Sequence, residues 1–141
     1  MPVNISELFI NATVEKVWET ITNPELVKQW QYGSDLISNW KPGSAIRFKT
    51  AWGDQLFEQW GKVVAFEPHR LVKYSLFAPR PGLEDRPEHY FMMSYVLTPE
   101  EGKTKLQIIQ EDNRPGAKQE AIQGEENPVL KALKELAEGE V

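Results

Sequence analysis

Apolar positions follow a helical spacing in two short segments near the start of the chain. A short apolar run at residues 5–10 predicts a first strand. Residues 14–21 then repeat apolar side chains at the spacing of one helix face, and Asn11 or Thr13 is expected to cap this helix. Asn23-Pro24 ends it and starts a second helix, predicted from Pro24 to about Gln29, because proline is well placed in a first turn.

Polar and apolar residues alternate from residue 35 onward, which predicts β-strands. Short turns between the apolar runs join consecutive strands into an antiparallel meander. The segment 78–87 contains three prolines and one glycine and is predicted to be a loop, either exposed, gating a pocket or contacting a partner. The strands themselves are predicted at 35–40, 45–52, 55–66, 71–77, 89–97 and 104–111.

The end of the chain returns to a helical pattern. Residues 118–123 are predicted to form a helical turn or more, interrupted at Gly124. Asn127 is then expected to cap an amphipathic helix that begins at Pro128 and ends near Glu138. One long sheet with one terminal amphipathic helix predicts an α+β fold in which the helix lies across the apolar face of the sheet.

Composition restricts the class of protein. The 141 residues match the usual size of one domain, so residues 1–141 are expected to form a single domain. With no cysteine there is no disulfide, thiolate metal site or cysteine nucleophile. The net charge of −5 argues against nucleic-acid binding and against attraction to anionic membranes. Residues 1–9 lack a secretory pattern and no stretch predicts membrane insertion, so we expect a cytoplasmic protein.

The order of these elements resembles a known superfamily. The residues that carry the resemblance are segments 12–18, 21–26 leading to Trp30, 40–43, 61–63, 67–71, 95–99 and 102–106. They are similar to the START-like superfamily (SRPBCC, birch-pollen-allergen-like), and within it to the branch named after the activator of the heat-shock-protein-90 ATPase. The resemblance implies a helix-grip fold, with a curved antiparallel sheet in the order β-α-α-β6-α wrapped around the C-terminal helix. The break at Gly124 and Pro128 departs from the family's longer uninterrupted helix.

In the resembling fold, inward-facing residues line a cavity between the sheet and the long helix. We therefore predict an apolar cavity for a small hydrophobic molecule, with a filled core as the alternative reading of the same residues. A single bulge would invert the inward and outward positions of every residue after it. Alternation and helical spacing place these residues in the cavity: Phe48, Thr50, Trp52, Tyr74, His89, Phe91, Met93, Tyr95, Leu106 and Ile108 from strands, and Leu130, Leu133 and Leu136 from the helix.

Two further functions compete with ligand binding. A cyclase- or hydrolase-like enzyme would use His89, Tyr74, Tyr95 or Glu58 as acid–base groups in the cavity. No nucleophile motif, phosphate loop or zinc-ligand spacing is present, so no catalytic residue, cofactor or metal is predicted. A chaperone co-factor is disfavoured, because the sequence carries a lone domain without the extra N-terminal domain of the eukaryotic co-chaperone. We expect a monomer or homodimer.

The remaining aromatic and charged residues have structural interpretations. Trp18 and Trp30 are expected to anchor the two short helices against the sheet, and His69 is expected in an exposed turn. Arg47 and Glu58 lie on neighbouring strands and are expected to form a cross-strand ion pair.

Overall fold

The structure, a computed structural model, describes residues 2–31, 33–112, 114, 116–119, 121–124 and 126–139, with the backbone alone for Trp52. No helix in these ranges is long and apolar enough to cross a membrane. The elements in chain order are β1 (Val3–Ile10), α1 (Val14–Thr22), α2 (Pro24–Trp30), β2 (Asp35–Ser38), β3 (Ala45–Trp52), β4 (Gln55–Glu67), β5 (Leu71–Leu76), the 3-10 turn η1 (Pro87–His89), β6 (Phe91–Glu100), β7 (Lys103–Asp112) and α3 (Pro128–Ala137).

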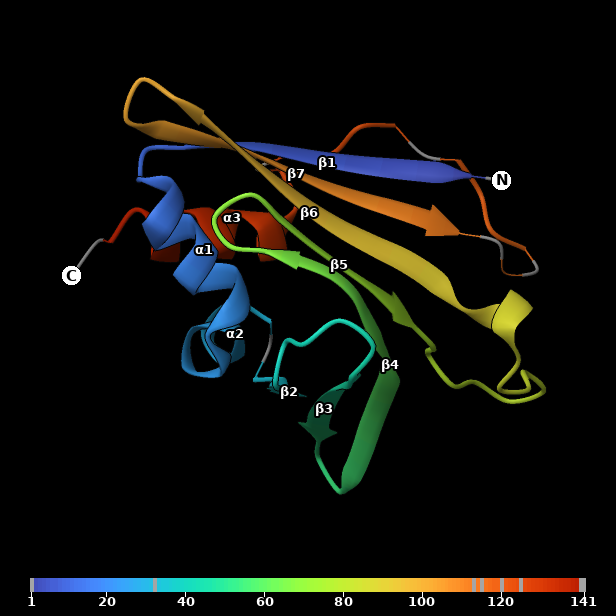
Figure 1. Cartoon of the computed structure of the whole chain (residues 1–141). Coiled ribbons are helices and arrows are strands. Elements are labelled where there is room, and N and C mark those ends of the chain that lie inside the picture. Colours follow the sequence, from blue (N-terminus) through green and yellow to red (C-terminus); the bar gives the residue numbers. More distant parts are fainter. Residues whose placement is uncertain are drawn as a thin grey trace.

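The strands form a seven-stranded antiparallel sheet in the order β1-β7-β6-β5-β4-β3-β2. The register of β4 against β5 shifts between Val63 and Ala65. The sheet curves, and β2, β3 and the first half of β4 turn away from the plane of β1, β7 and β6 (Figure 1). The three helices lie in the resulting hollow, so that the sheet has an inner face toward the helices and an outer face away from them (Figure 1).

Polar side chains begin each helix. The Thr13 hydroxyl accepts a hydrogen bond from Lys16 N at 3.3 Å, and this cap starts α1. Asn23 caps α2, and Asn127 Oδ1 accepts from Val129 N at 2.9 Å at the start of α3. Both of these helices begin with proline, as the sequence predicts. α3 packs against α1, α2 and β1, which closes one side of the hollow.

Two tryptophans anchor the short helices, as expected. Trp18 and Trp30 are buried, and Trp30 Nε1 donates to the Thr20 carbonyl at 2.8 Å. This bond ties the end of α2 to α1. His69 lies in an exposed turn, also as predicted, and its ring meets the edge of Trp18.

The predicted helical turn at 118–123 is wrong for the residues that the structure describes there. Gln123 instead forms a parallel bridge with Ser6, in which Glu7 N donates to Gln123 O at 2.8 Å and Gln123 N donates to Ile5 O at 3.1 Å. The free edge of β1 offers unpaired backbone groups to this segment, and those bonds outweigh the local helix preference.

Candidate functional site

A first space of about 230 Å³ opens on the inner face of the sheet, between β3, β4, β5 and β6. Its walls are set by strand pairing, because Phe48 on β3 faces Gln59 on β4 and Tyr74 on β5 faces Met93 on β6. The lining residues are Gln31, Ser34, Phe48, Thr50, Phe57, Gln59, Tyr74, Leu76, Phe91, Met93, Tyr95 and Gln110.

A second, larger space of about 650 Å³ adjoins the first. It lies between β1, β7 and the segment that leads into α3, and its lining includes Ile108 and Leu130. Four residues line both spaces: Gln31, Met93, Tyr95 and Gln110. Because these residues are shared, we treat the two spaces as one site and call it the inner cavity.

Most of the predicted cavity residues line the inner cavity. Those that do are Phe48, Thr50, Tyr74, Phe91, Met93, Tyr95, Ile108 and Leu130. Leu106 and Leu133 are fully buried but line neither space, so they belong to the filled core. Leu136 is half-buried and packs against that core. The side chain of Trp52 lies outside the described part of the chain.

The predicted position of His89 is wrong. β6 begins at Phe91, and His89 ends the 3-10 turn that Pro87 starts. Its Nδ1 lies 2.6 Å from the Glu84 carbonyl oxygen. His89 therefore does not share the alternation of β6 and does not line the inner cavity.

Sequence reasoning missed the polar part of the lining. Gln31, Ser34, Gln59 and Gln110 all line the inner cavity, and the Ser34 and Thr50 hydroxyl oxygens are 2.6 Å apart. The signal for two of them was present, because Gln59 and Gln110 occupy inward positions of β4 and β7 by alternation. The cavity is therefore mixed in character rather than apolar throughout.

Two buried tyrosines stand at the centre of the cavity wall. The rings of Tyr74 and Tyr95 stack with centroids 6.2 Å apart, and both side chains are buried. Burial raises the pKa of both phenols, and the neighbouring Tyr95 raises the pKa of Tyr74 further. Both hydroxyls are therefore neutral at physiological pH, which suits them to hydrogen bonding rather than to acting as a base.

A charged group lies at the end of β7, where the larger space opens. Asp112 is buried and accepts hydrogen bonds from Arg114 Nε at 2.9 Å and Nη2 at 2.6 Å. Gln110 Nε2 donates to the same carboxylate at 3.1 Å. These bonds, that from the Arg114 side chain above all, hold the pKa of Asp112 below its ordinary value. The carboxylate is thus ionised and fixes the guanidinium in place.

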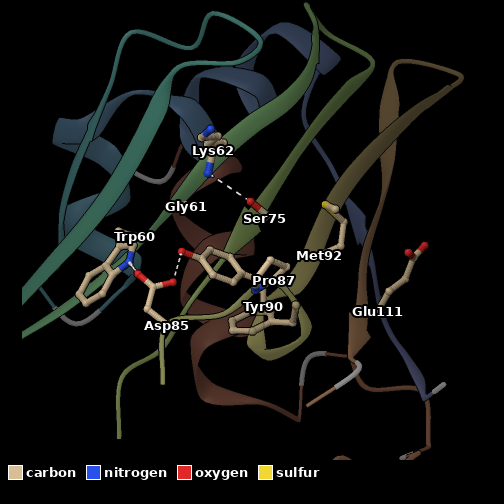
Figure 2. Close-up of a pocket in the computed structure, with 10 residues that line it drawn as sticks. Trp60, Gly61, Lys62, Ser75, Asp85, Pro87, Tyr90, Met92 and Glu111 are labelled. Carbon is tan, nitrogen blue, oxygen red and sulfur yellow. Dashed lines mark hydrogen bonds between the residues drawn. The ribbon is translucent and has the colours of Figure 1, made fainter. Parts of the chain in front are cut away.

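A groove of about 680 Å³ lies on the outer face and shares one lining residue, Phe91, with the inner cavity (Figure 2). Ser75, Met92 and Glu111 are register partners on β5, β6 and β7, one residue away from the inward Tyr74, Met93 and Gln110. Since successive residues of a strand face opposite sides, this row points away from the helices. We call this the outer groove; it adjoins the 78–90 loop and also includes Trp60, Lys62, Asp85, Pro87 and Tyr90.

Asp85 pins the loop to the outer face. Its carboxylate accepts from Trp60 Nε1 at 3.0 Å and from the Tyr90 hydroxyl at 2.7 Å (Figure 2). These bonds, first that from Tyr90, lower the pKa of Asp85. The rings of Trp60 and Tyr90 both pack on Phe77, which is 2% exposed. Residues of the predicted loop and the turn after it (78–90) therefore line the outer groove, and none of them lines the inner cavity.

The acid–base groups of the enzyme interpretation do not converge. Glu58 forms the expected cross-strand pair with Arg47 at 2.8 Å, outside the inner cavity. His89 is also outside it, which leaves the two neutral tyrosines inside. Among the residues that the structure describes, no cluster of three or more His, Asp or Glu side chains has the arrangement of a metal site.

The fold is the helix-grip fold of the START-like (SRPBCC) superfamily: an α+β structure with a curved seven-stranded antiparallel sheet and a C-terminal helix in its hollow. The chain belongs to the family of activator of Hsp90 ATPase homolog 1-like proteins, whose model matches residues 11–138. No curated protein sequence matches the chain.

Solved structures agree with this assignment. ChR145 from Cytophaga hutchinsonii is 32% identical, with 82% of this chain and 80% of that chain covered and a TM-score of 0.70. CV1439 from Chromobacterium violaceum is 18% identical, with 98% of each chain covered and a TM-score of 0.76. Ara h 8.0201 is 11% identical, with 96% of each chain covered and a TM-score of 0.68. The last two comparisons bear on the fold alone.

Proposed function

We propose that the protein binds a small organic molecule with an apolar body in the inner cavity. The observation that carries this is that two neighbouring spaces on the inner face share four lining residues, Met93 and Tyr95 among them. The combined size is in the range of small-molecule sites, and aromatic walls with a few polar groups are typical of such sites. Membership of a superfamily of cavity-bearing proteins supports the same function.

Neighbouring methionines provide a matched test of this proposal. Met93 lines both parts of the inner cavity, whereas Met92 lines the outer groove. A Met93→Trp substitution fills the inner cavity, and Met92→Trp adds the same side chain to the opposite face of the same strand. We expect a naphthalene-based fluorescent probe to bind the wild type and Met92→Trp, and to bind Met93→Trp at least about tenfold more weakly.

The competing outcomes separate clearly. Equal loss of binding in both variants, or loss in Met92→Trp alone, would place the probe outside the inner cavity and contradict the proposal. A panel of neutral aromatic and aliphatic molecules, with thermal unfolding as the readout, extends the test, because a ligand that binds the native state raises the unfolding temperature. A cytoplasmic location and a monomeric or homodimeric state stay predictions from the sequence, and a chaperone contact stays the disfavoured alternative.

A further inference from the structure

Charge is unevenly distributed over the lining of the inner cavity. Among the described residues, none that lines the smaller space is charged. The larger space has two cations, Arg114 and Lys118, and one carboxylate, Asp112. The lining residues that the structure describes therefore carry a formal charge of +1, in a chain whose net charge is −5. This reversal of sign, confined to one end of the cavity, favours an anionic group on the ligand.

Arg114 is the group best placed to meet that anion. Asp112 engages two of its five N–H donors, through Nε and Nη2, which leaves three that have no partner among the described residues. The guanidinium carbon also lies 4.2 Å from the centroid of the Phe91 ring, so this ring packs against the guanidinium group. The side chain is only 22% exposed. A guanidinium held in this way needs little further ordering to bind a ligand.

The ion pair with Asp112 does not prevent Arg114 from binding a ligand. The carboxylate accepts four hydrogen bonds, from Gln110 Nε2 and from the backbone N, Nε and Nη2 of Arg114. It is therefore satisfied and directs the guanidinium without covering it. Lys118 also lines the larger space as an exposed second cation, and it has no ion-pair partner among the residues that the structure describes.

We propose that the ligand of the inner cavity is a monocarboxylic acid with an aromatic or aliphatic body, whose carboxylate is held by Arg114 and attracted by Lys118. The body lies along Met93 and Tyr95 toward the smaller, uncharged space. Planar guanidinium groups are well suited to carboxylates, and charge-assisted hydrogen bonds are about twice as strong as neutral ones. This inference rests on the proposed binding function and adds the chemical class of the ligand.

The test compares 2-naphthylacetate with its neutral analogue 2-naphthylacetamide by calorimetric titration of the full chain. We expect the wild type to bind the acid about tenfold more tightly than the amide, as one charge-assisted contact would give. Arg114→Gln should bring the acid down to the affinity of the amide and leave the amide unchanged. Arg86→Gln is the matched control, because Arg86 also pairs with an acidic residue two positions earlier, Glu84, at 2.6 Å, but away from the inner cavity.

The outcomes distinguish this inference from the function on which it rests. Equal binding of acid and amide to the wild type overturns the carboxylate proposal alone, and this comparison needs no variant to fold. Equal weakening of both probes by Arg114→Gln also overturns it, because that pattern indicates a change in cavity shape rather than loss of a charge contact. If neither probe binds the wild type at millimolar concentration, both proposals fail.

Discussion

Gly61 allows β4 and β5 to approach each other more closely than any side chain permits. A Cβ atom at this position would lie 1.8 Å from the Ser75 carbonyl oxygen and 2.6 Å from its carbon. Cβ atoms essentially never come closer than 3.0 Å to another atom, so Gly61→Ala must move the strands by at least about 1.2 Å, the difference between the two distances. The clash is with backbone, which cannot rotate away.

The expected cost follows from what that movement breaks. Trp60 and Phe77 exchange two backbone hydrogen bonds, at 3.2 Å and 2.7 Å, next to this close approach of β4 and β5. Each contributes about 0.5–1.5 kcal/mol net, and overpacking adds about 1–3 kcal/mol. If both bonds are lost, we therefore expect Gly61→Ala to lower the free energy of unfolding by roughly 2–6 kcal/mol.

Urea unfolding followed by tryptophan fluorescence and circular dichroism measures this change. Gly53→Ala is the control: Gly53 has a φ of 63° with open space around its Cβ position, so only backbone strain of about 1–2 kcal/mol applies. A Gly61→Ala protein as stable as the wild type would show that β4 and β5 do leave room for a side chain at this position. So would a smaller loss than in Gly53→Ala.

Three further predictions concern the core, the charged pair and the outer loop. Leu133→Ala should lower the free energy of unfolding by about 2–5 kcal/mol in urea titrations, because the side chain is fully buried; a loss below about 1 kcal/mol would contradict its place in the core. Arg114 lowers the pKa of Asp112 in the folded state, so the stability that Asp112 contributes is present above its unfolded pKa of about 3.9 and is lost as the pH falls through the folded pKa. The stability advantage of the wild type over Asp112→Asn should therefore shrink between pH 6 and pH 3, and an advantage that grows would contradict the pairing. Asp85→Asn should speed amide hydrogen exchange in the 78–90 loop and leave the helices unchanged. Both hydrogen bonds that the Asp85 carboxylate accepts lose its charge, and one of them loses its acceptor oxygen. Unchanged exchange would refute the pinning role.

Local pattern was sufficient for most of the fold. Strand β3 matches its predicted bounds, because its alternation is strict and a Gly-Asp turn follows it. The same alternation placed Tyr74, Met93 and Tyr95 on the inner face, since the bulge near Val63 lies in β4 and leaves β5 and β6 in step. The seven-stranded order then follows from a meander whose first strand closes against the last.

The features that the sequence did not predict share a physical cause: contacts between residues far apart in the chain determine them. Residues 118–123 carry good helix formers, but pairing of Gln123 with the edge of β1 depends on a strand more than a hundred residues away. Alternation also cannot tell a cavity wall from a filled core, so Leu106 and Ile108 had the same pattern although only Ile108 lines the cavity. The contact between Asp85 and Trp60 is a side-chain hydrogen bond, and the alternation of polar and apolar residues gives no signal for such a bond.

The segment around Gln123, which pairs with the edge of β1 before α3 begins, also affects how the protein should behave in concentrated solution. Exposed strand edges are templates for pairing between molecules, and here Gln123 bonds to one edge of the sheet while the other edge, β2, is only four residues long. The same segment contributes Gln123 to the wall of the inner cavity. Displacement of this segment would open the cavity and uncover the edge together. If the inner cavity binds a molecule that contacts Gln123, we therefore expect that molecule to hold this segment on β1 and to reduce self-association.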